Sequence, residues 1–213
     1  MAHYRKLLGA AVGLNTAIVV GEAVAGWQAK SLSLLMDSIH NLSDEMALVF
    51  LFLAFLLPTA LSRTLLRSAN VLNSLGLLVM SAVLVWEAIA RLLHPMPMLG
   101  SVSVVIGFAA AVGNGGVAWL LQKPGKHNVA IRLAYVHNLG DVGVSFAPVV
   151  AGLLVTLSGQ FFFDPVTALV VAVWLIGSTL REMLASHEAL LWPEEAVCGH
   201  PAEAPVASGS GLL

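Results

Sequence analysis

Six long apolar stretches, separated by short polar breaks, constrain this chain more than any other feature of its sequence. A helix that crosses a bilayer needs roughly 20 mostly apolar residues. Charged residues make up only 10% of the chain and hydrophobic residues 58%, whereas a soluble domain carries about 25% charge. The sequence therefore predicts an all-α, polytopic membrane protein with six transmembrane helices and excludes a soluble, disordered or fibrous chain. The expected spans lie near Leu7–Gln28, Leu32–Leu57, Ala69–Leu92, Ser101–Leu121, Val129–Leu157 and Pro165–Leu184.

The distribution of Lys and Arg predicts how the chain is oriented. With six spans both termini lie on one side of the bilayer, and that side carries eight of the ten basic residues. Basic residues collect on the cytoplasmic side, so we expect both termini in the cytoplasm, and the compact chain favours a prokaryotic inner membrane. The net charge of −2 gives nucleic-acid binding no electrostatic basis. The eight residues are Arg5, Lys6, Arg63, Arg67, Lys123, Lys126, Arg132 and Arg181, and the other side holds Lys30 and Arg91.

The second and fifth spans carry the same short motif, which reads His-Asn-Leu-Ser-Asp from His40 to Asp44 and His-Asn-Leu-Gly-Asp from His137 to Asp141. Ionisable residues inside a membrane are costly and mark function by default. The spacing places His and Asp of each motif on one helix face, one turn apart. Two imidazoles and two carboxylates suit Zn²⁺, which takes four ligands tetrahedrally, and the carboxylates balance its charge. The sequence therefore predicts a metal site shared by the two spans.

Other ionisable residues within the spans are candidates for ion or proton movement. Asp37 lies on the same helix face as Asp44 but nearer the outer end of the span. It is either a carboxylate that the metal ion passes on entering or leaving the site, or a charge that stabilises the helix N-terminus. Glu22 and Glu87 either take part in proton or ion transit or form interhelical hydrogen bonds. Glu45 points away from the His40 face and is left out of the site.

Two further features concern the fifth span and the end of the chain. Pro148 predicts a kink in the fifth helix, seven residues after Asp141. We expect residues 1–191 to form the transmembrane domain and residues 192–213 to form a short, disordered cytoplasmic tail rich in Ala, Pro, Gly and Ser. Cys198 and His200 lie in this tail and His187 lies shortly before it. We expect them to bind metal weakly at most, because a flexible segment does not hold ligands in a fixed geometry.

The sequence resembles the cation diffusion facilitator family of metal transporters over nearly its whole length. The resemblance lies in the segments Ser31–Asp44 and Asn128–Asp141, together with Asn15, Glu22, Gly26, Glu87 and the Asp164-Pro165 pair. It implies six helices, a transport site between the second and fifth, alternating access and exchange of metal for protons, and the His/Asp set is similar to the zinc-selective branch. Because the family usually adds a cytoplasmic domain after the sixth helix, we expect a short form without it. A homodimer through the transmembrane domain stays open.

These observations favour a secondary transporter, not an enzyme, that exports Zn²⁺, Cd²⁺ or another divalent metal from the cytoplasm. Two alternatives stay open at this point. One is a membrane haem protein with His40 and His137 as axial ligands, although haem would not require an Asp after each His. The other is an intramembrane zinc enzyme, although the sequence has no H-E-x-x-H motif and catalytic zinc keeps an open position.

Overall fold

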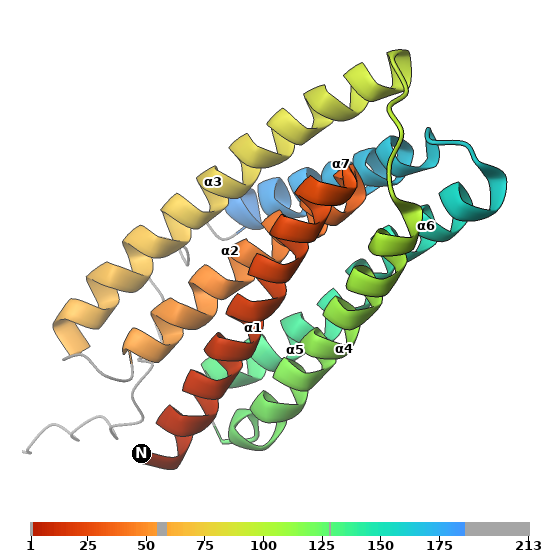
Figure 1. Ribbon diagram of the computed structural model, residues 1–213. Helices are drawn as coiled ribbons and strands as arrows, with labels where there is room; N and C mark the ends of the chain where they lie inside the picture. Colours follow the sequence, from red (N-terminus) through yellow and green to blue (C-terminus); the bar gives the residue numbers. More distant parts are fainter. Residues whose placement is uncertain (1, 55–58, 128, 186–213) are drawn as a thin grey trace, which may run out of the picture.

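The computed structural model describes residues 2–54, 59–127 and 129–185, and within these ranges the chain forms helices and no strand. The prediction of an all-α chain is therefore confirmed. The expected tail, with Cys198 and His200, and also His187 lie outside the described residues. Figure 1 shows the helices in order: α1 (Ala2–Ala29), α2 (Leu32–Ala54), α3 (Thr59–Leu93), α4 (Gly100–Gly125), α5 (Val129–Val144), α6 (Phe146–Ser158) and α7 (Phe163–Ala185).

Five helical segments of the described chain are long and apolar enough to cross a membrane, and α2 is the sixth helix. Helices α5 and α6 together form one of the five segments. Helix α2 falls short by composition because it contains Asp37, Asp44 and Glu45. The five segments are Lys6–Ala29, Ser74–Leu93, Gly100–Gly125, Ile131–Ser158 and Phe163–Arg181.

Three helix boundaries differ from the sequence expectation by four residues or more, and the first is the start of α1 at Ala2 rather than near Leu7. Helix α3 begins at Thr59 rather than near Ala69, and α4 continues through the expected break to Gly125. The reason is that hydropathy marks where a chain leaves the apolar layer, while the helix can continue into the polar region beyond it. Ser, Arg and Lys in these extensions are acceptable helix residues once the helix has been nucleated.

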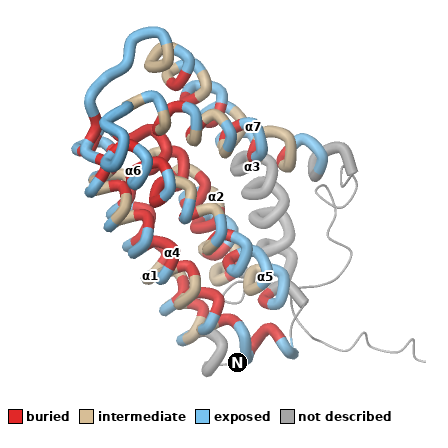
Figure 2. Tube along the Cα trace, turned by 90° about the vertical axis from the view of Figure 1, so that its right-hand side faces the viewer, coloured by how far each residue is buried: buried red, intermediate tan, exposed pale blue. Residues whose placement is uncertain are grey.

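The distribution of side chains is inverted relative to that of a soluble protein, as expected for a bundle surrounded by lipid. Large apolar residues face outward, and Trp27, Trp86 and Leu157 are 78%, 77% and 82% exposed. Polar residues are buried instead, with Asn15 and Asn114 at 0% exposure. Figure 2 shows exposed positions recurring along the outer faces of the helices and buried positions along the inner faces.

Helix α2 lies at the centre of the packing and contributes to both apolar clusters of the bundle. Helix α1 packs against α2 and α4, α4 against α5 and α6, and α3 against α2 and α7. One cluster joins α1, α2, α4 and α5, and the other joins α2, α3 and α7. The first contains Leu8, Ala11, Ile18, Leu48, Leu51, Ala110, Val117, Leu121 and Ile131, and the second contains Leu32, Met36, Leu84, Ala88, Ala168, Ala172 and Leu175.

The fifth span is interrupted at Ser145, one turn after Asp141. Pro148 causes the break because it has no N–H to donate to the carbonyl of Val144 and its ring crowds that carbonyl. The interruption therefore lies three residues before the proline, and Pro148 occupies the first turn of α6. The Ser145 N–H still donates to the Asp141 carbonyl at 2.9 Å, so the break leaves Asp141 on a complete helical turn.

Candidate metal centre

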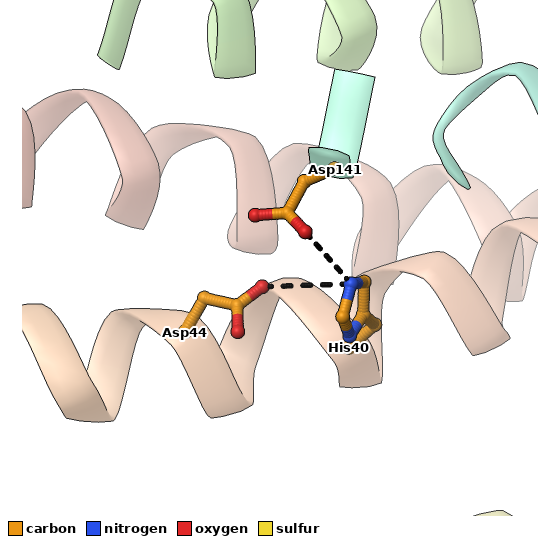
Figure 3. A group of neighbouring side chains, drawn as sticks. All are labelled: His40, Asp44 and Asp141. Atoms are coloured by element: carbon orange, nitrogen blue, oxygen red, sulfur yellow. Dashed lines mark hydrogen bonds and ion pairs between the residues drawn. The ribbon is translucent and has the colours of Figure 1, made fainter. Parts of the chain in front are cut away.

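Helices α2 and α5 bring the two copies of the His-x-x-x-Asp motif together inside the bundle. The Nε2 atom of His40 lies 3.1 Å from Oδ1 of Asp141, across the helix pair. The same nitrogen lies 3.7 Å from Oδ2 of Asp44, one turn further along α2. Figure 3 shows the two carboxylates converging on the His40 ring, with Asp141 entering from α5.

His137 completes a crossed arrangement in which the histidine of each helix lies against the aspartate of the other. Its Nε2 atom is 2.6 Å from Oδ1 of Asp44, and its ring centroid is 6.0 Å from that of His40. The structure thus brings all four residues of the two motifs together. They differ in access, because the His137 side chain is 55% exposed while those of His40, Asp44 and Asp141 are 5–6% exposed.

The chemistry of this cluster suits a cation. His40, Asp44 and Asp141 each offer a ligand atom, and these atoms all lie within 4.8 Å of one another. One oxygen of each carboxylate, Oδ2 of Asp44 and Oδ2 of Asp141, has no hydrogen-bond partner within the described residues. Among those residues no Lys or Arg forms an ion pair with either carboxylate. Two buried carboxylates without a fixed counter-charge are costly, so the cluster is arranged for positive charge, which protons on the two histidines or a bound cation can supply.

A ring contact that could not be predicted from the amino-acid sequence also borders the cluster. Trp174 on α7 lies edge-on to His40, with the ring centroids 6.5 Å apart. Trp174 carries no polar motif and is separated from His40 by 134 positions, so neither spacing nor chemistry points to it. Its ring borders the His40 imidazole on the side of α7.

The three additional candidate carboxylates have different surroundings. Asp37 and Glu22 are each 1% exposed and lie close together, one turn beyond His40 toward the start of α2. Glu87 is not part of either group: its Oε1 atom pairs with Nε of Arg91 at 3.0 Å near the end of α3, and 44% of its side chain is exposed. Glu45 accepts a hydrogen bond from Thr16 on α1 at 2.6 Å, which agrees with its exclusion from the site.

Comparisons with known proteins identify relatives along most of the chain. A family model described as the cation efflux transmembrane domain matches residues 67–191. The zinc transporter ZitB of Escherichia coli K12 is 32% identical over 196 residues, which cover 88% of this chain and 62% of the relative. The cadmium, cobalt and zinc/H(+)-K(+) antiporter of Bacillus subtilis 168 is 29% identical over 184 residues, 82% of this chain and 59% of the relative.

A human relative extends the similarity beyond bacteria. The probable proton-coupled zinc antiporter SLC30A3 is 26% identical over 219 aligned residues, which cover 85% of this chain and 56% of the relative. The chain therefore spans about three fifths of the length of the curated relatives that it matches.

Proposed function

Because this chain belongs to the cation diffusion facilitator family, we propose that it exports Zn²⁺ from the cytoplasm in exchange for protons, as a secondary transporter that works by alternating access. The observation that carries the proposal is the crossed contact between α2 and α5, in which the histidine of each helix lies against the aspartate of the other. Zinc is named as a transported ion for all three relatives described above, which supports Zn²⁺ as the substrate.

In this proposal His40, Asp44, His137 and Asp141 are the four ligands of the transported ion. Imidazole nitrogen and carboxylate oxygen are both good zinc ligands, and four of them satisfy a tetrahedral site. The two carboxylates cancel the charge of Zn²⁺, so the loaded site is neutral. Neutrality matters because an uncompensated charge in a low-dielectric interior is expensive.

Competition between Zn²⁺ and protons at these ligands supplies the coupling. An imidazole must be neutral and a carboxylate ionised to bind metal, and histidine ordinarily titrates near neutral pH. When the site faces the cytoplasm, Zn²⁺ displaces one or more protons, and when it faces outward, protons displace Zn²⁺. An inward proton gradient then drives export, with about 1.4 kcal/mol available per proton for each pH unit.

We propose that the ion enters the site from the cytoplasm. We propose that both termini are cytoplasmic, in line with the distribution of Lys and Arg, which puts the start of α2 at the outer end. Asp164 at the start of α7 hydrogen-bonds the start of α2 and holds the outer end together. At the site itself the His137 side chain on α5 is half-exposed while those of His40, Asp44 and Asp141 are buried, which supports entry of the ion past this ring.

The contacts favour transport over the two alternatives considered from the sequence. Each histidine Nε2 faces a carboxylate, and the two rings lie 6.0 Å apart with carboxylates between the helices, so the rings are not presented to the two faces of a haem. A catalytic zinc site keeps an open position with three protein ligands, whereas the two motifs here supply four candidates: His40, Asp44 and Asp141 within 4.8 Å of one another, and His137 against Asp44. The relatives are transporters by name, which supports a protein that is not an enzyme.

The remaining parts of the proposal concern organisation. We propose that residues 1–191 form the transport domain and residues 192–213 a cytoplasmic tail, which agrees with the end of the family match at residue 191. We propose the inner membrane of a prokaryote as the location, since the bacterial relatives are among the most similar, and dimerisation through the transmembrane helices.

Flux measured in proteoliposomes tests the function directly. Purified protein is reconstituted into vesicles that contain a zinc-sensitive dye and a pH-sensitive dye, and His40→Ala/His137→Ala serves as the inactive control. We expect Zn²⁺ flux with an opposite proton flux, both absent from the double variant. Zn²⁺ flux without proton movement would retain the site and reject the coupling, and equal flux through the double variant would reject the site.

Replacing His40 with aspartate is expected to change which metals are transported. The substitution exchanges a nitrogen ligand for an oxygen ligand, and oxygen ligands suit harder ions such as Mn²⁺. We expect His40→Asp to gain Mn²⁺ transport relative to Zn²⁺, by roughly tenfold in a competition assay, which corresponds to about 1.4 kcal/mol of relative affinity. A metal preference identical to that of the unmodified protein would contradict the assignment of His40 as a ligand.

A further inference from the structure

A second buried polar network lies next to the His/Asp cluster, toward the outer end of the bundle. Asn41 on α2 is its centre: its Nδ2 atom donates to Oε2 of Glu22 on α1 at 2.7 Å. Asn114 on α4 donates to Oδ1 of Asn41 at 3.1 Å and to Oγ of Ser145 at 3.0 Å, and Asn15 on α1 donates to the Asn41 carbonyl at 3.2 Å. The network therefore joins α1, α2, α4 and the α5–α6 break.

This network contains more acceptor oxygens than it has donors to satisfy. Neither oxygen of Asp37 has a hydrogen-bond partner among the described residues, although Asp37 is 1% exposed and lies beside the Glu22 carboxyl group and the Ser145 hydroxyl. One oxygen each of Glu22, Asn15 and Asn114 is also without a partner in the same part of the chain. Buried polar atoms are nearly always satisfied in folded proteins, so five such oxygens in one connected network point to a missing positive group.

The charges lead to the same conclusion. Glu22 and Asp37 are two neighbouring carboxyl groups in the membrane interior, and no Lys or Arg of the described chain pairs with either. A Zn²⁺ ion held by the His/Asp cluster would balance Asp44 and Asp141 but leave this pair uncompensated. A single proton shared by the pair would satisfy two of the five oxygens, whereas a metal ion can accept several oxygen ligands at once.

We propose that Glu22 and Asp37 form a second, oxygen-only position for a divalent cation, which the transported ion occupies on its way between the His/Asp cluster and the outer side of the membrane. The proposal rests on the proposed transport function for its physiological role, but the binding position itself does not depend on it. Asp37 precedes His40 by one turn on α2, so an ion that leaves the cluster toward the outer end meets this carboxylate first. Oxygen ligands without nitrogen suit hard ions such as Mn²⁺.

Equilibrium dialysis of the purified full chain in detergent, with Mn²⁺ alone and with Zn²⁺ alone, tests the proposal. Mn²⁺ reports the oxygen-only position, and its electron paramagnetic resonance spectrum reports all-oxygen coordination. We expect Mn²⁺ to bind the unmodified chain and the His40→Ala/His137→Ala variant alike, and Glu22→Gln or Asp37→Asn to weaken that binding at least tenfold. Zn²⁺ binding at the His/Asp cluster should persist in Glu22→Gln, which shows that this variant is folded.

A matched control distinguishes the loss of the proposed cation position from the general effect of removing a buried carboxylate. Glu45→Gln removes another buried carboxylate of α2, one that bonds Thr16 rather than the network, and it should leave Mn²⁺ binding unchanged. Loss of Mn²⁺ binding in the double histidine variant but not in Glu22→Gln would overturn the proposal. An absence of Mn²⁺ binding would also overturn the proposal. In that case an infrared band of a protonated carboxyl group, present in the unmodified chain and removed by Glu22→Gln, would show that the pair holds a proton instead. Because dialysis requires no transport, failure of the transport assay would leave this result unaffected.

Discussion

Replacing Asp44 with asparagine is expected to abolish zinc transport and to weaken Zn²⁺ binding by about 100-fold or more, since even residues that only support a metal ligand are worth 10–100-fold in affinity. Asp44 is the carboxylate that contacts both histidines, His137 at 2.6 Å and His40 at 3.7 Å. Asparagine keeps the shape but removes the charge, so a bound Zn²⁺ would carry a net charge of about +1 in a low-dielectric site. Binding is measured by zinc dialysis and transport by flux in vesicles.

The same experiment includes variants that distinguish ligand loss from unfolding. His40→Ala and Asp141→Ala should also abolish transport, while the protein remains monodisperse in detergent. Glu45→Gln changes the residue next to Asp44 but not the cluster, because Glu45 bonds Thr16 on α1, and it should bind and transport zinc normally. Wild-type transport by Asp44→Asn or Asp141→Ala would contradict the ligand assignment.

The helices of this bundle could be predicted from the sequence because the membrane imposes a simple requirement on length and composition. The pairing of α2 with α5 was also predictable, since two identical His-x-x-x-Asp motifs at one-turn spacing are best explained by one shared site. The contacts agree with that expectation, with His40 on Asp141 and His137 on Asp44. Local spacing fixes which residues share a helix face, and the repeat identifies which faces meet.

Features that depend on contacts between distant segments could not be predicted. Trp174 lies against His40 although nothing in its local sequence distinguishes it from the exposed Trp27, Trp86 and Trp119. The polar network around Asn41 could not be predicted either, because its residues come from four parts of the chain. Each residue alone is compatible with an ordinary interhelical hydrogen bond. The start of α3 at Thr59 was missed because hydropathy does not report helix that extends beyond the apolar layer.

The start of α2 is anchored by a single buried carboxylate, and its removal should have the largest effect on stability. Asp164, at the start of α7 and 1% exposed, accepts hydrogen bonds from the Leu32 N–H at 2.6 Å, the Ser33 N–H at 3.1 Å and the Ser31 hydroxyl at 2.8 Å. The first N–H groups of a helix have no partner within the helix, and a negative charge there is favoured by the helix dipole. Asp164 therefore joins α2 to α7 and caps α2 together with Ser31, whose hydroxyl accepts from the Leu34 N–H at 3.2 Å.

We expect Asp164→Asn to destabilise the protein by about 3 kcal/mol, because hydrogen bonds to a charged group are worth about 1.5–3 kcal/mol each and are not additive. Asparagine has only one acceptor oxygen, so at least one N–H at the start of α2 loses its partner. Thermal unfolding in detergent without metal measures the change. Ser31→Ala, which removes one bond to Asp164 and also the cap on the Leu34 N–H, should cost about 1–2 kcal/mol.

Comparing Asp164→Asn with Asp44→Asn distinguishes a loss of stability at the start of α2 from a loss of zinc binding. Asp44→Asn should lose zinc binding without lowering the unfolding temperature of the metal-free protein, because it removes a charge that is unfavourable there in the absence of metal. Asp164→Asn should do the reverse: the metal-free protein unfolds at a lower temperature, while the folded fraction still binds zinc through His40 and Asp44. Excess zinc should then recover part of the lost stability, because it binds only the folded state. Unfolding of Asp164→Asn at the temperature of the unmodified protein would show that the start of α2 is held by its apolar contacts alone.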